Sequence, residues 1–337
     1  MRPEGTAFPA ARLRGQFQRL TALGALAGLL GIFSLINPNF CSAANGVNLL
    51  RQIVPILLIT IAQSLVMITG NIDLSIGSCV GLSSMVMATL LSRGIVQTIP
   101  AMLISLLCCL LLGLCNGLLV ALCRLPAFIV TLGTMTIARG AAQLVGGSYN
   151  TDAITKFYPA QAQQFKQIFY YGKTLGLYNG VWIALVLLLA ADALLRRTRT
   201  GRWIRAAGCN PNGARLSGVD VTGTVLLVYC ISAFCAFAAG LMNCAAVGQG
   251  TMDCGSGYEM YAVASAVIGG VSILGGRGSM PGAAVGAAIW GTLENGLQFA
   301  GAPVAIRNII VGVVMLCAVL LDVMLCARQR ARREEQP

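Results

Sequence analysis

The sequence of 337 residues contains no histidine. Histidine is the commonest general base and the commonest metal ligand, so its absence disfavours a hydrolytic or metal-dependent enzyme. The 13 cysteines include no Cys-x-x-Cys pair, and without histidine the mixed Cys/His zinc sites are excluded. Most cysteines lie within apolar runs, and we interpret them as small packing residues. The cysteines in apolar runs are Cys79, Cys108, Cys109, Cys115, Cys123, Cys230, Cys235 and Cys317.

Charged residues are also scarce, at 10% of the chain against about 25% in a typical soluble domain. Hydrophobic residues make up 57%, and the mean hydropathy is +0.78. A water-soluble core does not need so much apolar surface, whereas a transmembrane helix needs about 20 mostly apolar residues. The composition therefore predicts an all-α polytopic membrane protein with a single domain over residues 1–337.

Apolar runs bounded by Pro, Gly, Asn and charged residues predict about ten transmembrane helices. They are expected near residues 20–36, 47–69, 76–92, 100–123, 127–145, 179–195, 222–247, 259–274, 281–299 and 304–326. Some runs are short or polar, so some helices are expected to be broken or re-entrant. The first run resembles a signal peptide followed by Ser42-Ala43-Ala44, but it is longer than a usual signal-peptide core, so we expect it to remain as a span.

The net charge of +12 comes from basic residues at the ends of apolar segments rather than along one face, so we exclude nucleic-acid binding. Placing both termini inside puts most basic residues on the inner side, as the positive-inside rule requires. The predicted topology is therefore N-in and C-in. The inner residues would be Arg2, Arg12, Arg14, Arg19, Arg124, Arg196, Arg197, Arg199, Arg202, Arg205, Arg215, Arg277, Arg328, Arg330, Arg332 and Arg333.

Two long loops follow from this topology. Segment 146–178 is polar and aromatic and holds every lysine of the chain, and we expect it outside. Segment 196–221 is rich in arginine and has no acidic residue before Asp220, and we expect it inside. Within it, Asn210 and Pro211 suit the start of a short helix, to which Ala214, Leu216 and Val219 would give an apolar face. Such a helix can dock on another protein or anchor the loop on lipid headgroups.

Residues 69–78 (TGNIDLSIGS) interrupt two apolar runs with a carboxylate, an amide and hydroxyls. A carboxylate at membrane depth usually faces a polar interior, so Asp73 is a candidate for the translocation pathway. Asp73 and Ser75 also suit the cap of the next helix, which we favour over direct substrate contact.

Two further segments combine polar and small residues. In 125–140, Thr131 and Thr134 share a helical face that suits close packing, and Arg139 is expected near the outer interface. In 255–270, Glu259 opens a helix, where a carboxylate is favoured. Glu294 is a third acid within a predicted span, and Asn-Gly-Leu recurs at 116–118 and 295–297, a hint of duplicated halves. The sequence Gly172-Lys173-Thr174 lacks the glycine that a phosphate-binding loop requires five residues earlier, so we find no ATP site.

These segments, in this order, resemble the membrane permease subunits of bacterial ATP-binding-cassette importers for simple sugars, of the ribose type that depends on a binding protein. That family's signatures read Gly-Gly-Ile-Asp-Leu-Ser-Val-Gly-Ser, Phe-Ile-x-Thr-Leu-Gly, Asn-x-x-Ala-x-Arg-Leu-Ser-Gly and Gly-x-Gly-Tyr-Glu-Leu. The resemblance extends from Asn37-Pro38-Asn39-Phe40 to the last helix. The chain departs from the pattern at Asn71, Tyr261 and 211–213.

The resemblance implies a permease subunit of the inner (cytoplasmic) membrane that is not itself an enzyme. Its expected partners are ATPase subunits that bind ATP-Mg, a second permease subunit (the same or a different chain), an external solute-binding protein and a ribose-like sugar, with no cofactor in this chain. The implied ATPase-coupling residues are Gly201, Arg202, Asn210, Arg215, Leu216, Ser217 and Gly218. The expected pathway residues are Ile72, Asp73, Leu74, Ser75, Thr131, Thr134, Tyr258 and Glu259.

Other functions stay open at this point. The solute is a sugar, a nucleoside, a sugar-derived signal or a branched-chain amino acid. A stand-alone transporter would couple to ions through Asp73, Glu259 and Glu294, since intramembrane acids often carry protons or ions. A membrane-embedded enzyme would need a catalytic set, and the sequence offers none.

Overall fold

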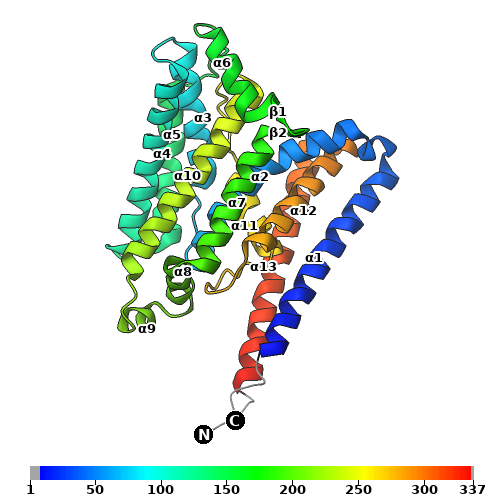
Figure 1. The fold of residues 1–337 in the computed structure, drawn as a ribbon, viewed down its shortest axis with the longest axis vertical. Helices are drawn as coiled ribbons and strands as arrows, with labels where there is room; N and C mark the ends of the chain where they lie inside the picture. The colour runs from blue at the N-terminus through cyan, green and yellow to red at the C-terminus, as the bar shows by residue number, and fades with distance from the viewer. Residues whose placement is uncertain (1–7, 335–337) are drawn as a thin grey trace.

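The computed structural model describes the backbone of residues 8–334 and most side chains between residues 22 and 324. Arg2 lies outside the described residues, and the side chains of Arg12, Arg14, Arg19, Arg328, Arg330, Arg332 and Arg333 lie outside the described side chains. Apart from a two-stranded antiparallel hairpin, β1 (Lys173–Thr174) and β2 (Leu177–Tyr178), the regular structure of this part is helical (Figure 1). The prediction of an all-α chain is therefore confirmed.

The predicted apolar runs all coincide with helices. These helices are α1 (Phe8–Ile36), α2 (Ala43–Ile68), α3 (Ile76–Ser92), α4 (Thr98–Ala121), α5 (Ala127–Gly146), α7 (Asn179–Arg197), α10 (Val221–Val247), α11 (Tyr258–Ile268), α12 (Met280–Phe299) and α13 (Val304–Glu334). The connecting segments add η1 (Pro38–Cys41), α6 (Pro159–Lys166), η2 (Gln167–Tyr171), α8 (Arg199–Cys209) and α9 (Pro211–Leu216).

Five helices in the described part are long and apolar enough to cross a membrane by length and composition: α2, α4, α5, α7 and α10. Helix α11 has only 11 residues, so at 1.5 Å per residue it covers about half of a hydrocarbon core that is about 30 Å thick. The expectation of a helix over 259–274 is wrong in its second half, because the chain leaves the helix at Gly269 and Gly270 adopts φ +82°. The prediction that some spans are broken is thus confirmed at α11.

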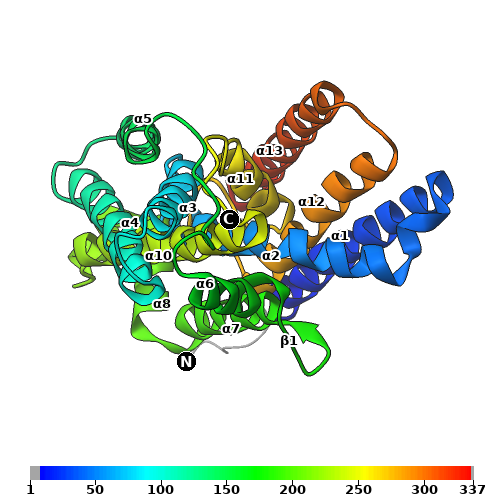
Figure 2. The same ribbon diagram turned by 90° about the horizontal axis from the view of Figure 1, so that it is seen from above.

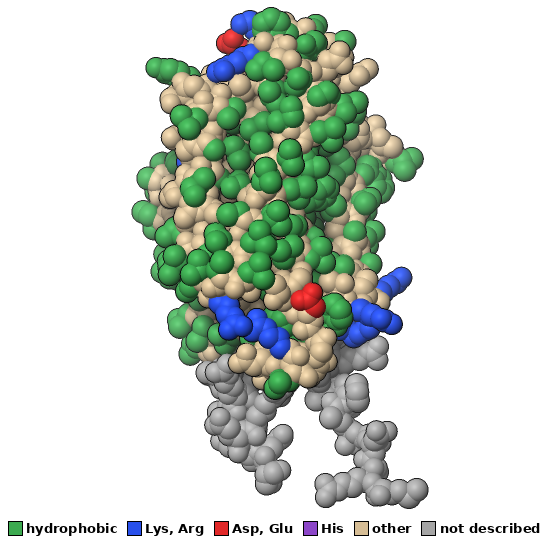
Figure 3. Space-filling model, turned by 90° about the vertical axis from the view of Figure 1, so that its left-hand side faces the viewer, with side chains coloured by type: hydrophobic (Ala, Val, Ile, Leu, Met, Phe, Trp, Pro, Cys, Tyr) green, Lys and Arg blue, Asp and Glu red, His purple; other side chains and the backbone are tan. Residues whose placement is uncertain are grey.

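Helix α4 shows how the chain is turned towards lipid. Large apolar side chains at every fourth position, Ile99, Leu103, Leu107 and Leu111, are exposed. The opposite face buries small or polar residues: Ala101, Ser105, Cys109, Gly113 and Asn116. In a water-soluble protein the apolar stripe would face the core instead. The surface view agrees, because hydrophobic side chains cover the middle of the face and charged side chains gather at its two ends (Figure 3).

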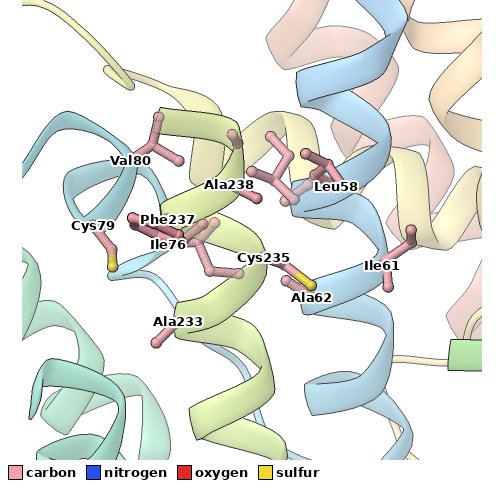
Figure 4. Packing of buried hydrophobic residues seen from close by; sticks show 14 of the residues in the cluster. Leu58, Ile61, Ala62, Ile76, Cys79, Val80, Ala233, Cys235, Phe237 and Ala238 are labelled. Carbon is pink, nitrogen blue, oxygen red and sulfur yellow. The ribbon is translucent and has the colours of Figure 1, made fainter. Parts of the chain in front are cut away.

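The core forms where α10 lies between α2 and α3 (Figure 4). Small residues let these helices approach closely, as is usual in membranes. A Cβ on Gly240 of α10 would lie 2.6 Å from the Ser83 side chain of α3, and a Cβ on Gly113 of α4 would lie 2.6 Å from the Ala233 side chain of α10. Cysteines take part in this packing, as predicted for Cys79, Cys109 and Cys235, which are buried. Cys115, Cys123 and Cys317 are instead exposed on the outer surface of the helices.

The packing pattern occurs twice in the chain. Helix α10 packs against α3 and α4, and in the same way α2 packs against α11 and α12 (Figure 2). The two Asn-Gly-Leu sequences occupy matching places, because Asn116 of α4 and Asn295 of α12 are both buried and both hydrogen bond to another helix. The repeated tripeptide therefore coincides with a repeated arrangement of helices.

The two long loops lie at opposite ends of the molecule. Helix α6 and the β-hairpin are at one end, whereas α8, α9, the start of α1 and the end of α13 are at the other (Figure 1). This arrangement keeps the predicted outer and inner segments apart and places both ends of the described chain on the side of the arginine-rich loop.

Candidate translocation and coupling sites

The segment between α2 and α3 is a buried break in the helical structure. The chain leaves α2 at Thr69, turns at Gly70 with φ +81° and re-enters a helix at Ile76. A left-handed glycine directly after a helix is a common way to end it, because glycine has no Cβ to clash in that conformation. This turn places Asp73 between α3 and α10, where its side chain is only 3% exposed.

The Asp73 carboxylate accepts three hydrogen bonds. Its Oδ1 accepts from the Ser75 backbone N–H at 2.9 Å and from the Ser75 hydroxyl at 2.6 Å. Its Oδ2 accepts from the Ser232 hydroxyl of α10 at 2.8 Å. Ser75 occupies the N-cap position of α3, as predicted, but its side chain makes no capping hydrogen bond to the first turn. Asp73 instead fixes the turn before the helix and ties it to α10.

The hydrogen bonds continue from Ser75 into α4 and α5. The Asn116 amide donates to the Ser75 hydroxyl at 2.8 Å, and the Thr134 hydroxyl donates to the Asn116 oxygen at 2.7 Å. A second branch reaches the Ile72 carbonyl, which accepts from the Tyr229 hydroxyl at 3.2 Å and from Thr131 at 3.5 Å.

We call Ile72, Asp73, Ser75, Asn116, Thr131, Thr134, Tyr229 and Ser232 the Asp73 network. It includes five of the predicted pathway residues, and Leu74 lies half-buried beside it. Side-chain networks of this kind rigidify the segments that they join when every group is satisfied. The network therefore fixes the α2–α3 break against three helices.

A cavity of about 280 Å³ lies near the opposite end of α2 and α10. Five aromatic rings contribute to its wall: Phe169, Tyr170, Tyr178, Tyr258 and Tyr261. Its polar groups are Arg51, Gln52, Asn243, Ser256, Glu294 and Gln298. Of these residues, the sequence analysis names Tyr258 as a pathway residue and Glu294 only as an acid within a span, because the lining comes from several separate segments that carry no shared motif.

Arg51 organises the aromatic side of this cavity. Its guanidinium carbon lies 3.7 Å from the ring centre of Tyr178 and 5.0 Å from that of Tyr170, within the range of cation–π attraction. Burial raises the pKa of Tyr170 more than the neighbouring Arg51 lowers it, so this phenol stays protonated at neutral pH. The Tyr258 hydroxyl donates to the Asn243 oxygen at 3.3 Å, which links α11 to α10.

Glu259 follows Tyr258 in the chain but lies elsewhere. Its side chain is 7% exposed and faces Gly77 of α3, where any side chain larger than hydrogen would collide with the carboxylate. Arg139 does not lie free at an interface, since it donates to the Cys254 carbonyl at 3.0 Å. The predicted pathway residues are thus divided among the Asp73 network, the cavity and the α3–α11 contact.

The arginine-rich loop folds into α8 and α9, and the short helix predicted to start at Asn210 and Pro211 is α9. The Thr198 hydroxyl accepts from the Gly201 N–H, and the Asn210 oxygen accepts from the Gly213 N–H at 3.0 Å, so Asn210 caps α9 and Pro211 opens it. The expected apolar face holds for Ala214 and for the partly buried Val219, which pack with the core, but not for Leu216. Ala214 is buried, whereas Leu216 is 92% exposed, because residues two apart on a helix point in nearly opposite directions.

The predicted coupling residues therefore differ in accessibility. Gly201 is buried against the carbonyls of Leu194 and Leu195. The others form the exposed surface that we call the coupling surface: Arg202, Asn210, Arg215, Leu216, Ser217 and Gly218.

The inner end of α8 contacts the α2–α3 break. A Cβ on Gly208 would collide with the Ile68 carbonyl at the end of α2 and would lie 2.6 Å from the Gly276 nitrogen. The Gly276 N–H donates to that same Ile68 carbonyl at 2.9 Å, and Gly275 packs against Gly70. Backbone contacts through glycine thus join α8, the end of α2 and the turn after α11. A displacement of α8 would press directly on the segment that carries Asp73.

Known proteins resemble this chain over most of its length. Residues 45–319 match the family described as "Branched-chain amino acid transport system / permease component". The chain is 35% identical over 301 residues to the ribose import permease protein RbsC of Escherichia coli K12, which covers 89% of this chain and 92% of that protein.

Two further relatives are named for other substrates. The D-allose transport system permease protein AlsC of Escherichia coli K12 is 33% identical, over 88% of this chain and 89% of the relative. The autoinducer 2 import system permease protein LsrC of Photorhabdus laumondii is 31% identical, over 95% of this chain and 93% of the relative. No solved protein structure matches the chain.

Proposed function

Because this chain belongs to the family of branched-chain amino acid transport system / permease components and is a multi-pass membrane protein, we propose that it is the membrane-spanning subunit of an ATP-binding-cassette importer. Its solute is a ribose-like monosaccharide, and its site is the inner membrane of a bacterium. It hydrolyses no ATP itself, because ATP-Mg is bound and hydrolysed by separate ATPase subunits.

The coupling surface is the observation that carries this proposal. Leu216 projects at the tip of a short capped helix with 92% of its side chain exposed, beside the exposed Arg215. An isolated apolar side chain on a rigid, basic tip suits insertion into a pocket of a partner protein, the usual form of a binding hot spot. A lipid-anchoring loop would need only the charge, not the cap at Asn210.

The geometry supports a simple route for the ATPase to act on the pathway. A partner that pulls α9 also moves α8, whose Gly208 backbone lies against the end of α2 and against the 275–276 turn. Those two segments lead into the Asp73 network and into α11. A second permease copy, identical or different, would complete the pathway, and a binding protein would deliver the solute at the end that carries α6 and the β-hairpin.

The substrate class is inferred from the relatives. Their names give ribose, D-allose and autoinducer 2, so a small polyhydroxylated solute is common to them. A nucleoside or a branched-chain amino acid would be carried by more distant relatives of the sugar permeases. The alternative of a stand-alone ion-coupled transporter gains little support from Asp73, whose oxygens are occupied by three protein donors.

The test is to purify the tagged chain in mild detergent from its native membrane and to identify the co-purifying proteins by mass spectrometry. We expect an ATPase with a phosphate-binding loop, and we expect the double variant Arg215→Asp/Leu216→Asp to lose it. The matched control is Lys173→Asp/Leu175→Asp, another exposed basic–leucine pair, on the β-hairpin at the other end. A chain that purifies alone under several gentle conditions and takes up solute with an ion gradient would overturn the proposal.

A further inference from the structure

A second, smaller space of about 80 Å³ adjoins the cavity described above. The two spaces share Tyr261 and Glu294, which therefore stand between them. The smaller one reaches towards Trp290 of α12 and towards Arg307 and Asn308 of α13. Together they run from α7 and η2, past α11, to α13, all within a single chain.

Three buried N–H donors around these spaces have no acceptor among the described residues. Arg51 Nε belongs to the wall of the larger space, and Trp290 Nε1 and Arg307 Nε belong to the wall of the smaller one. Buried donors in native proteins nearly always have a partner, so a group of three calls for a specific explanation. These N–H groups are covered by protein atoms, so the oxygen atoms of a bound molecule would reach them only where the side chains turn towards the spaces.

The chemistry of the walls selects the class of molecule. Glu294 makes no hydrogen bond and no ion pair within the described part of the chain, so it is free to accept from a ligand hydroxyl; Gln298 and Asn243 add amide groups. Tyr258 and Tyr261, whose ring centres lie 5.8 Å apart, both line the larger space and add aromatic surface against which the C–H face of a sugar can pack. A ligand that both donates to a carboxylate and accepts from guanidinium and indole N–H groups is a polyol. Arg51 and Arg307 face a single acid, Glu294, so the charge of the walls does not itself exclude an anion, and the choice of a neutral sugar over a sugar phosphate follows from the proposed function.

We propose that the two spaces form one binding site for a neutral polyhydroxylated molecule of monosaccharide size, held inside a single permease chain. The choice of sugar rests on the proposed function, whereas the existence of the site rests on the donors and the cavity. This site is separate from the Asp73 network and needs no second copy of the chain. It predicts one bound molecule per chain.

The experiment measures equilibrium binding of radiolabelled D-ribose and D-allose to the purified full chain in lipid nanodiscs. We expect saturable binding of at least one of them with one site per chain. Val181→Phe places a ring into the larger space, and we expect it to weaken binding at least tenfold. The matched control is Val186→Phe on the same helix, since Val181 lines the cavity and Val186 is 62% exposed on the outer surface.

A second variant guards against a folding defect. Glu294→Gln keeps the size of the side chain and removes its charge, and we expect tenfold weaker binding with an unchanged unfolding temperature. Absent binding of both sugars, one site per two chains, equal binding by Val181→Phe, or tighter binding of D-ribose 5-phosphate than of D-ribose would each overturn the inference.

The two proposals fail in different ways. Sugar binding to a chain that recruits no ATPase would leave this site standing and refute the importer. Sugar transport by the assembled importer without one-per-chain binding would leave the importer standing and refute the site.

Discussion

At one end of α2, the Asp73 carboxylate accepts three hydrogen bonds, whereas near the other end Arg51 and Glu294 line a cavity with hydrogen-bonding groups to spare. Both regions are polar, and both contain an acidic residue that the sequence places in or beside a predicted span, Asp73 in one and Glu294 in the other. They differ in whether the hydrogen-bond partners of the polar groups are supplied by the protein itself.

The difference indicates separate roles for the two carboxylates. A buried polar group that is fully paired stabilises one arrangement of the helices, and removing one partner leaves the others unpaired at a cost. A buried polar group that has no partner in the protein is available to hydrogen bond to a ligand or to water. Intramembrane acids are thus better sorted by the hydrogen bonds around them than by their depth alone.

The largest effect is expected from Asp73→Ala, which would leave Ser75 and Ser232 without their acceptor. Hydrogen bonds to charged groups contribute about 1.5–3 kcal/mol each, so we expect the free energy of unfolding to fall by about 3 kcal/mol or more. Thermal unfolding of the purified variant in detergent, with the yield of folded protein, measures this. A variant that unfolds like the native chain but fails to transport would place Asp73 in solute contact and erase the contrast between the two ends.

Much of the fold could be predicted because lipid imposes a simple rule on the sequence. Runs of about 20 apolar residues must become helices, and each predicted run coincides with one. The exception in length is α11, where Val271, Ile273 and Leu274 continue the run although Gly269 and Gly270 end the helix. Hydropathy cannot detect that end, since glycine is tolerated within membrane helices and only the surrounding packing decides its conformation.

The sites could be predicted less well, for a reason visible in their residues. The motif around Asp73 is local, so it was identified, but its partners Asn116 and Ser232 are single polar residues in apolar helices, and nothing in the sequence pairs them. The cavity brings together residues as distant as Arg51 and Glu294. Leu216 lies in the arginine-rich loop that the sequence singles out, yet its exposure depends on which side of α9 packs against α10.

An intermediate effect is expected when the same substitution is made at the two ends. A Cβ on Gly208 would meet backbone atoms of Ile68 and Gly276. On Gly180, beside the cavity, its nearest contact would be the Phe169 carbonyl at 3.0 Å, and the next would be the Val54 side chain at an ordinary 3.7 Å. Overpacking typically costs about 1–3 kcal/mol, and we expect Gly208→Ala to be in that range and Gly180→Ala clearly below it.

The measurement is the free energy of unfolding of both variants. Gly133→Ala is the reference, because its Cβ would meet nothing within 4 Å. In the assembled importer, Gly208→Ala is also expected to hydrolyse ATP with reduced transport, because the α8 contact lies between the two activities. Equal stability of the Gly208 and Gly180 variants would mean that the end of α2 near the Asp73 network is no more tightly packed than the end beside the cavity.

The smallest effect is expected at Asp152, an exposed carboxylate in segment 146–178 that provides a counterpart to the buried Asp73. Lys156 donates to it at 2.7 Å, and this hydrogen bond lowers the pKa of Asp152 below its ordinary value of 3.8.

A carboxyl group whose pKa is lower in the folded state stabilises the fold above its unfolded pKa and loses that contribution as the pH falls through the folded value. We therefore expect Asp152→Asn to lower the unfolding temperature by at most about one degree at neutral pH, and by progressively less as the pH falls through the lowered pKa, because exposed ion pairs contribute little. A larger difference, or one that grows as the pH falls, would show that the outer segment depends on its surface charges as the buried end depends on Asp73.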